Sequence, residues 1–176
     1  MRVLVVGAGG VGAAIARAAA ESEVLEHVVV TDVDIIRASV AVERCADTRF
    51  VAHAHDASDA GAIAAVAARE RIDVVLNACD PRLNPSIFAA AFDSGCHYID
   101  MAMTLSEPHA HRPHEPPGVM LGAEQFDASH LWKERGLLAL VGMGVEPGLS
   151  DVFARYAADI CSRRSIRSGC ATAPIW

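Results

Sequence analysis

The chain has 176 residues, of which 52% are hydrophobic and 21% charged, and a formal net charge of −7 from 15 basic and 22 acidic residues. This length and composition indicate one globular domain with a short extension, and they exclude a disordered or low-complexity protein. Lys133 is the single lysine, so the clustered cations that a nucleic-acid partner needs are missing, and we expect no such partner.

Cysteine usage and hydropathy predict the compartment. The cysteines are odd in number and show no Cys-x-x-Cys spacing, which argues against a disulfide framework and a zinc site. They are Cys45, Cys79, Cys96, Cys161 and Cys170. No apolar segment approaches the roughly 18 residues that cross a membrane, and residues 1–6 lack the cleavage pattern of a signal peptide. We therefore expect a cytoplasmic protein that contacts no membrane.

The first half of the chain alternates apolar strands with Ala-rich helices. Residues 2–6 form a short continuous apolar run, which is typical of a strand buried on both faces of a sheet. The predicted elements are strands over 2–6, 27–31, 49–54 and 74–77 and helices over 12–20 and 60–68. Strands that alternate with helices imply a parallel sheet with right-handed crossovers.

The second half continues the same alternation. A helix follows the fourth strand, with Asn84 predicted as its N-cap, Pro85 at its first position and Gly95 just past its end. Residues 98–100 and 137–141 predict the fifth and sixth strands. The fold class is therefore α/β, a Rossmann-type doubly wound parallel sheet with helices on both faces.

A long connection, residues 101–136, separates the last two strands. Its middle, residues 107–117, holds four Pro and three His, so we expect a surface loop or lid. The spacing of His109, His111 and His114 resembles a metal site, but a Pro-rich loop offers no fixed geometry. We interpret them as solvated loop histidines and predict no metal.

A glycine motif, Gly7-Ala8-Gly9-Gly10-Val11-Gly12, lies between the first strand and the first helix. A diphosphate needs several hydrogen-bond donors, and a helix N-terminus offers unpaired N–H groups with a partial positive charge. Gly7 permits the tight turn, Gly9 lets the backbone approach the phosphates, and Gly12 lets the helix pack on the strand. The alternative is a purely structural glycine turn. The context of strand, helix and second-strand acid favours a dinucleotide site.

The acid at the end of the second strand is Asp32, about twenty residues after the motif. It is placed to accept hydrogen bonds from the adenosine ribose and to repel a 2′-phosphate, so NAD is favoured over NADP. Alternatively, Asp32 caps the next turn; Asp34 could compete for the ribose, and Arg37 and Arg44 could meet a 2′-phosphate. Asp56-Ala57 follows the third strand, where the adenine edge would lie, but a plain Asx turn is equally compatible.

Four segments together carry a family resemblance. They are the glycine motif, Asn77-Ala78-Cys79-Asp80-Pro81, Gly95 to Asp100, and Gly144-Val145-Glu146-Pro147-Gly148-Leu149-Ser150. With them the chain resembles the saccharopine dehydrogenase family from residue 1 to about 159. It looks most like the bacterial lysine 6-dehydrogenase and saccharopine dehydrogenase-like members, which carry a similar His/Pro-rich loop, here residues 114–118.

The resemblance implies hydride transfer between a nicotinamide and a C–N bond of an amino acid or amine. It also implies that residues 77–81 pass near the nicotinamide ribose and that the Pro147-Gly148-Leu149 turn borders the cofactor. Glu146 is a weak candidate acid or base, since a loop carboxylate beside proline is more often solvated. The predicted cofactor-binding residues are Gly7, Gly9, Gly10, Val11, Gly12, Asp32, Asp56, Ala57, Asn77, Ala78, Asp80, Pro81, Gly148 and Leu149.

The end of the chain departs from the family pattern. Family members continue with an α+β substrate domain, whereas this chain stops at Trp176. We therefore expect residues 1–150 to be the dinucleotide-binding domain and residues 151–176 the start of a connection to a missing domain. From about residue 160 the tail loses periodicity, and we hypothesise a reading-frame error there, which sequencing of the gene would test.

Without a substrate domain, the chain alone is expected to be a weak or inactive enzyme, and its uncovered surface favours self-association into a homo-oligomer. Two other interpretations stay open. One is an NAD-sensing regulatory module, similar to the potassium-channel conductance regulators, and the other is a nonfunctional fragment.

Overall fold

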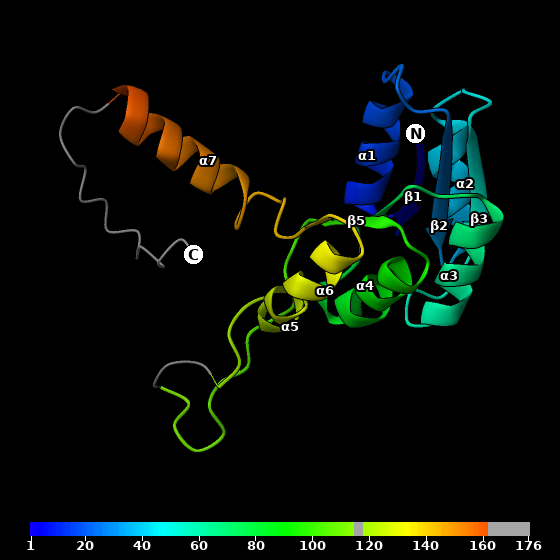
Figure 1. The fold of residues 1–176 in the computed structure, drawn as a ribbon. Coiled ribbons are helices and arrows are strands. Elements are labelled where there is room, and N and C mark those ends of the chain that lie inside the picture. The colour runs from blue at the N-terminus through cyan, green and yellow to red at the C-terminus, as the bar shows by residue number, and fades with distance from the viewer. Residues whose placement is uncertain (115–117, 162–176) are drawn as a thin grey trace.

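The computed structural model describes residues 1–114 and 118–161, and a six-stranded parallel sheet lies at the centre of this part (Figure 1). The strand order is β3-β2-β1-β4-β5-β6, which places β1 in the interior and reverses the direction of winding beside it. The strands are β1 (Arg2–Val6), β2 (His27–Asp32), β3 (Phe50–Ala54), β4 (Val74–Asn77), β5 (His97–Asp100) and β6 (Ala139–Leu140). This is the predicted doubly wound Rossmann-type sheet.

Helices cover both faces of the sheet. Val3 and Val5 of β1 belong to one core cluster with residues of α1 and α2, whereas Leu4 and Val6 belong to another with residues of α3 and α4. Successive side chains of a strand alternate between faces, so a continuous apolar run fills both cores. The helices are α1 (Gly10–Ala20), α2 (Ile35–Glu43), α3 (Ala60–Arg69), α4 (Asn84–Asp93), α5 (Ala123–Asp127), α6 (Ser129–Glu134) and α7 (Leu149–Tyr156), with the short 3-10 helix η1 (Pro81–Leu83) and π-helix η2 (Ala157–Cys161).

Helix α2 is among the elements that the sequence did not predict. Its apolar Ile35, Ile36 and Val40 are 44%, 69% and 37% exposed, while its buried residues are Ala38 and Ala41. The large apolar side chains therefore lie on the solvent side, and the usual apolar stripe does not mark the buried face.

The prediction that Asn84 is an N-cap is wrong. The turn η1 runs directly into α4, so Leu83 occupies the N-cap position and Asn84 is already helical. The Asn84 side chain is 1% exposed and donates a hydrogen bond to the Ala102 carbonyl at 2.7 Å. It joins two segments of the interior and caps no helix end.

The sixth strand is shorter than the predicted span of residues 137–141. The Leu137 amide donates to the Trp132 carbonyl at 2.9 Å, and the Gly142 amide donates to the Asp100 carboxylate at 2.7 Å. Both ends of the segment are thus drawn away from the ladder, which leaves Ala139–Leu140 as β6.

The connection between β5 and β6 is a loop in its first part and helical in its second. Glu107 and Val119 pair as an isolated antiparallel bridge at the stem of an arm that projects from the body (Figure 1). The surface loop was predicted for residues 107–117, whereas α5 and α6 form further along, where no element was predicted. Trp132 is 3% exposed and its ring centroid lies 4.7 Å from that of Phe88, so α6 contributes to the core.

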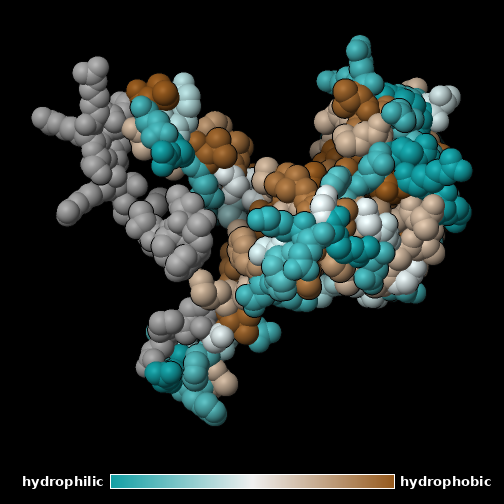
Figure 2. Space-filling view, viewed as in Figure 1, coloured by the Kyte–Doolittle hydropathy of each residue, from teal (hydrophilic) through white to brown (hydrophobic). Residues whose placement is uncertain are grey.

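Helix α7 extends away from the sheet and has no buried residue (Figure 1). Its exposed apolar and aromatic side chains repeat at helical spacing, and brown surface lies along the helix in Figure 2. They are Leu149, Val152, Phe153 and Tyr156. The hypothesis of a frame-shifted tail falls mostly on residues 162–176, which lie outside the described residues.

Candidate functional site

The carboxyl ends of the parallel strands meet at one edge of the sheet, which we call the carboxyl edge. Because β1 lies between β2 and β4, the glycine turn after β1 adjoins Asp32 at the end of β2 and residues 77–81 after β4. In doubly wound sheets, ligands bind at the carboxyl ends of strands where the winding reverses. The topology therefore brings the sequence-predicted residues of three separate segments to one edge.

Two glycines of the turn are required by the chain itself. Gly7 has a φ of +99°, and a Cβ there would lie 2.9 Å from the Cys79 sulfur and 3.1 Å from the Ala78 carbonyl oxygen. A Cβ on Gly12 would lie 1.8 Å from the Gly7 carbonyl oxygen. These two positions close the turn and seat α1 against β1, as the motif predicts.

The other two glycines face open space. A Cβ on Gly9 or Gly10 would meet no heavy atom within 4 Å, and Gly9 has an ordinary φ of −68°. No contact within the described chain thus requires glycine at either position. Val11 beside them is 52% exposed. Bare backbone at the start of an eleven-residue helix leaves room for a diphosphate, so the residues present fit a dinucleotide.

Asp32 is tied to the turn. One carboxylate oxygen of Asp32 accepts a hydrogen bond from the Ala8 amide at 2.9 Å, and the other accepts from the Asp34 amide at 3.0 Å. The alternative that Asp32 caps the next turn is therefore correct. It does not displace the ribose prediction, because each carboxylate oxygen can accept a second hydrogen bond. Asp34 instead caps α2 by accepting a hydrogen bond from the Ile36 amide, and its carboxylate oxygen lies 3.7 Å from the Arg37 Nε.

Asp56 forms the Asx turn that the sequence left open as an alternative to an adenine contact. Its carboxylate accepts hydrogen bonds from the Ser58 amide at 2.8 Å and from the Ser58 hydroxyl at 2.7 Å, which lower the pKa of Asp56. The Ala57 carbonyl accepts a hydrogen bond from the Ser86 hydroxyl at 2.6 Å, which joins this turn to α4. Both residues lie past the end of β3, and a contact with adenine stays a prediction.

The segment after β4 divides into a buried and an exposed part. The Asn77 side chain is buried and donates to the Asn84 carboxamide oxygen at 2.8 Å and to the Tyr98 hydroxyl at 3.1 Å. It is only 2% exposed, while the backbone of Ala78 packs beside Gly7. Asp80 is exposed, and its hydrogen bonds with Arg82 lower the pKa of Asp80 to about 2.

A buried polar network behind the edge was not foreseen. It joins the ends of β4 and β5 to α4 and α5, and Asp100 and Gln125 are 1% and 5% exposed. Polar residues inside otherwise apolar strands need partners, and this signal could have revealed Asn77 and Asp100. The members are Asn77, Asn84, Tyr98, Asp100 and Gln125.

The loop after β6, residues 142–148, is tightly wound. Gly144 and Gly148 form an isolated bridge, and a Cβ on Gly148 would lie 2.4 Å from the Gly144 carbonyl oxygen. Glu146 is exposed and accepts a hydrogen bond from the Ser150 hydroxyl. Leu149 begins α7 and is 47% exposed. The loop follows the same edge of the sheet, two strands away from β4.

Cys79 and Cys96 behave as packing residues. Cys96 is buried, and Cys79 is half-buried with its thiol donating to the Val6 carbonyl at 3.3 Å. Burial, with a smaller effect of Asp32, raises the pKa of Cys79 to about 11. Thiolates are the reactive form, so Cys79 is a poor nucleophile at neutral pH.

Neither a metal cluster nor a membrane span is found in residues 1–114 and 118–161. No three His, Cys, Asp or Glu side chains in this part are grouped to hold a metal ion, and His109, His111 and His114 lie on the projecting arm. None of the helices in this part is long and apolar enough to traverse a bilayer.

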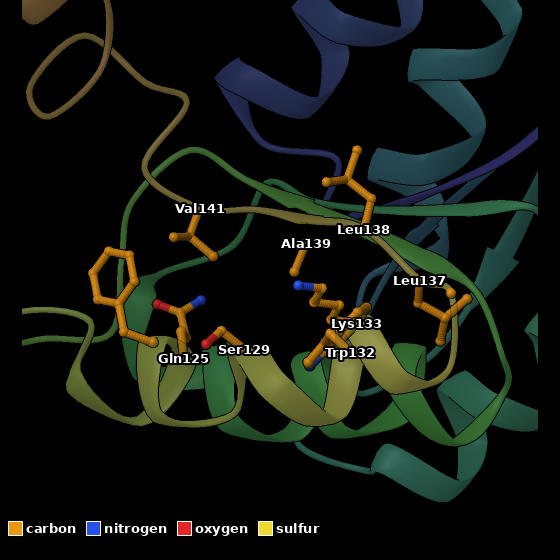
Figure 3. A pocket seen from close by; sticks show the side chains of 10 residues that line it. Gln125, Ser129, Trp132, Lys133, Leu137, Leu138, Ala139 and Val141 are labelled. Atoms are coloured by element: carbon orange, nitrogen blue, oxygen red, sulfur yellow. The ribbon is translucent and has the colours of Figure 1, made fainter. Parts of the chain in front are cut away.

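A cavity of about 420 Å³ lies between α5, α6 and β6 (Figure 3). Its walls are mainly apolar, with Trp132, Leu137 and Val141 around it and Lys133 at its side (Figure 3). None of its lining residues belongs to the glycine turn. It is therefore separate from the predicted dinucleotide site.

Residues 3–140 match the family model described as the saccharopine dehydrogenase NADP binding domain. The chain is 27% identical over 168 residues to carboxynorspermidine synthase of Vibrio alginolyticus, covering 89% of this chain and 39% of that protein. It is 26% identical over 162 residues to carboxyaminopropylagmatine dehydrogenase of Synechocystis, covering 89% and 37%. The chain thus spans about two fifths of the length of these curated relatives.

Solved structures share the fold. Apo saccharopine dehydrogenase (L-Glu forming) of Saccharomyces cerevisiae matches with a TM-score of 0.67 and 16% identity, covering 90% of this chain and 30% of that chain. GenD2 in complex with NAD matches at 0.59 and 15%, covering 81% and 34%. A metagenomic short-chain oxidoreductase in complex with NADP matches at 0.52 and 20%, covering 79% of each chain. At these identities the matches establish the fold.

Proposed function

Because the chain belongs to the saccharopine dehydrogenase NADP-binding domain family, we propose that it binds NAD(H) at its carboxyl edge and serves hydride transfer at a C–N bond. Its coarse identity is that of a Rossmann-type NAD(P)-binding domain of saccharopine dehydrogenase-like oxidoreductases. The preference for NAD, the class of substrate and the residues that act on them belong to the proposal.

The observation that carries the proposal is the open backbone of Gly9 and Gly10. Neither position needs glycine for a contact within the described residues, whereas Gly7 and Gly12 do. A ligand that must approach the helix start closely supplies the missing reason. Amides at the start of α1 would hold the diphosphate, and Asp32 would accept hydrogen bonds from the adjoining ribose.

The preference for NAD depends on Asp32. The family model is described as NADP-binding, and the structural matches include complexes with NAD and with NADP, so both cofactors occur among similar proteins. A carboxylate fixed beside the turn repels a 2′-phosphate. Arg37, the cation nearest to this acid in the sequence, lies 3.7 Å from Asp34. These charges support NAD.

The proposed reaction converts an amine and an imine into each other. A bound nicotinamide would supply the hydride chemistry, which makes or breaks the C–H bond on the carbon beside the nitrogen. Breaking that C–H bond and an N–H bond forms the C=N bond, and the chain or solvent must take the proton. Glu146, exposed on the loop after β6, is the candidate for that proton.

The substrate class follows from the relatives. The names of both curated relatives refer to a carboxylated amine, and that of the yeast structure refers to an amino acid dehydrogenase. We therefore propose an amino acid or a carboxylated amine as the substrate. Residues 1–150 would form the cofactor domain and residues from 151 a connection to a substrate domain. The unburied apolar face of α7 supports that boundary.

Two measurements test the proposal. Titration calorimetry with NAD tests binding, and the absorbance of reduced nicotinamide tests turnover with NAD and lysine, saccharopine or carboxynorspermidine. Binding without turnover would limit the chain to holding the cofactor, as a sensing module or an incomplete enzyme does. Absence of binding would refute the proposed function as a whole.

A further inference from the structure

We propose that Asp100 is a positioning residue whose buried side chain fixes the loop of residues 142–148 where it borders the nicotinamide half of the dinucleotide. This inference rests on the proposed function, because it requires a dinucleotide across the carboxyl edge. It assigns a role to a carboxylate that neither the glycine motif nor the ribose contact uses.

Asp100 accepts hydrogen bonds from two successive residues at the start of the loop. It is the last residue of β5 and is 1% exposed. One carboxylate oxygen accepts a hydrogen bond from the Gly142 amide at 2.7 Å, and the Asp100 carbonyl accepts one from the Met143 amide at 2.9 Å. The side chain and the backbone of one residue therefore anchor the start of the loop.

The second carboxylate oxygen is held from the other side by α5. It accepts a hydrogen bond from the Gln125 carboxamide nitrogen at 2.6 Å. The Gln125 oxygen in turn accepts one from the Thr104 amide at 2.9 Å, so the carboxamide has a fixed orientation. Asp100 must then present acceptors in both directions, which an ionised carboxylate does and a carboxamide does not.

The loop has little freedom beyond this anchor. A Cβ on Gly144 would lie 2.2 Å from the Met101 carbonyl oxygen, so the loop passes directly against the residue that follows Asp100. Gly142 and Gly148 have φ values of +69° and +132°, which are rare for other residues. Loss of the Asp100 acceptor would release the loop at its first residue.

Burial of the ionised Asp100 carboxylate costs free energy. Its hydrogen-bond donors are the Gly142 amide, the Gln125 carboxamide and the Tyr98 hydroxyl, all of them neutral. Burial raises the pKa of Asp100 despite these hydrogen bonds. A buried carboxylate whose hydrogen-bond donors are all neutral is expensive to keep ionised, so its presence at a ligand edge points to a role beyond packing.

The strand order places the loop of residues 142–148 near the nicotinamide half of the proposed ligand. The glycine turn and Asp32 lie at the ends of β1 and β2, where they would take the diphosphate and the adenosine ribose. The rest of the molecule must extend over β4 and β5 toward β6. The loop begins beyond β6 and is fastened to the end of β5, so it lies on the nicotinamide side.

The test compares NAD with ADP-ribose, which lacks the nicotinamide. Asp100→Asn places a new N–H donor against either Gln125 or Gly142. We expect it to weaken NAD binding by about tenfold, as the ordered loop becomes a minor state, and to leave ADP-ribose binding unchanged. In Asp100→Asn/Gln125→Glu the donor and the acceptor are exchanged, and NAD binding should recover. Ile63→Ala, in the core of α3, should lower the melting temperature without changing the ratio of the two affinities.

Hydrogen exchange supplies a readout that needs no ligand. The amides of Gly142 and Met143 should exchange faster in Asp100→Asn than in the wild type, and should slow again in the double variant. Unchanged exchange would overturn the positioning role, and so would an equal loss of both ligands in Asp100→Asn. Wild-type protein that binds neither ligand would refute the proposed function and, with it, the nicotinamide part of this inference.

Discussion

The Asp32 carboxylate accepts a hydrogen bond from the Ala8 amide at 2.9 Å, which fastens the end of β2 to the glycine turn of β1. The acid and the turn thus form one unit before any ligand arrives. A preformed arrangement of this kind spares a ligand the cost of ordering the chain.

Asp32→Asn should lower NAD affinity by about tenfold or more, because a charge-assisted hydrogen bond to the ribose is lost. It should lower NADP affinity less, because the repulsion of the 2′-phosphate is also lost. Calorimetric titration with both cofactors measures each effect. Asp34→Asn is the matched control, since asparagine caps α2 as well as aspartate does. An equal effect of the two substitutions would contradict the role of Asp32.

Substitutions of Gly9 and Gly12 should separate binding from folding. Gly9→Ala should leave the melting temperature nearly unchanged but abolish measurable NAD binding, because the Cβ enters the space assigned to the diphosphate. Gly12→Ala should destabilise the fold, because its Cβ would lie 1.8 Å from the Gly7 carbonyl oxygen. Thermal melts and calorimetry give both values. Undiminished NAD binding by a folded Gly9→Ala variant would place the ligand elsewhere.

Glu70 should contribute a pH-dependent part of the stability. The Arg69 side chain and, to a smaller extent, His27 lower the pKa of Glu70, and His53 lies 3.3 Å from the carboxylate. A lowered folded-state pKa means that this stabilisation is present above the unfolded pKa and disappears as pH falls through the folded one. In urea titrations, the difference between wild type and Glu70→Gln should therefore shrink below about pH 4.5. A difference that grows on acidification would contradict this sign.

The aromatic cluster of Phe88, Tyr98 and Trp132 should contribute to the stability of the fold and not to NAD binding. The Phe88 ring centroid lies 5.0 Å from that of Tyr98 and 4.7 Å from that of Trp132. Phe88→Ala should cost about 3–5 kcal/mol of unfolding free energy, as large cavities in a core do. The folded fraction should bind NAD with unchanged affinity. A loss of affinity in parallel with stability would show that this core shapes the site.

The buried strands and the glycine motif could be predicted from the sequence for a clear reason. Buried parallel strands are apolar on both faces, so β1, β2 and β4 appear as continuous runs, and the turn needs glycine where its own backbone closes. Local sequence patterns failed to predict the structure where tertiary contacts determine the conformation of a residue. Ile35, Ile36 and Val40 of α2 are exposed, and Asn84 turns inward to the Ala102 carbonyl. Distant partners such as Gln125 for Asp100 leave no local spacing in the chain.

The account depends most on which dinucleotide the carboxyl edge binds, and one calorimetric comparison of NAD with NADP on the wild-type chain tests this directly. We predict saturable one-to-one binding of NAD and weaker binding of NADP, with the difference reduced in Asp32→Asn. Absence of binding by both, or tighter binding of NADP, would contradict the account.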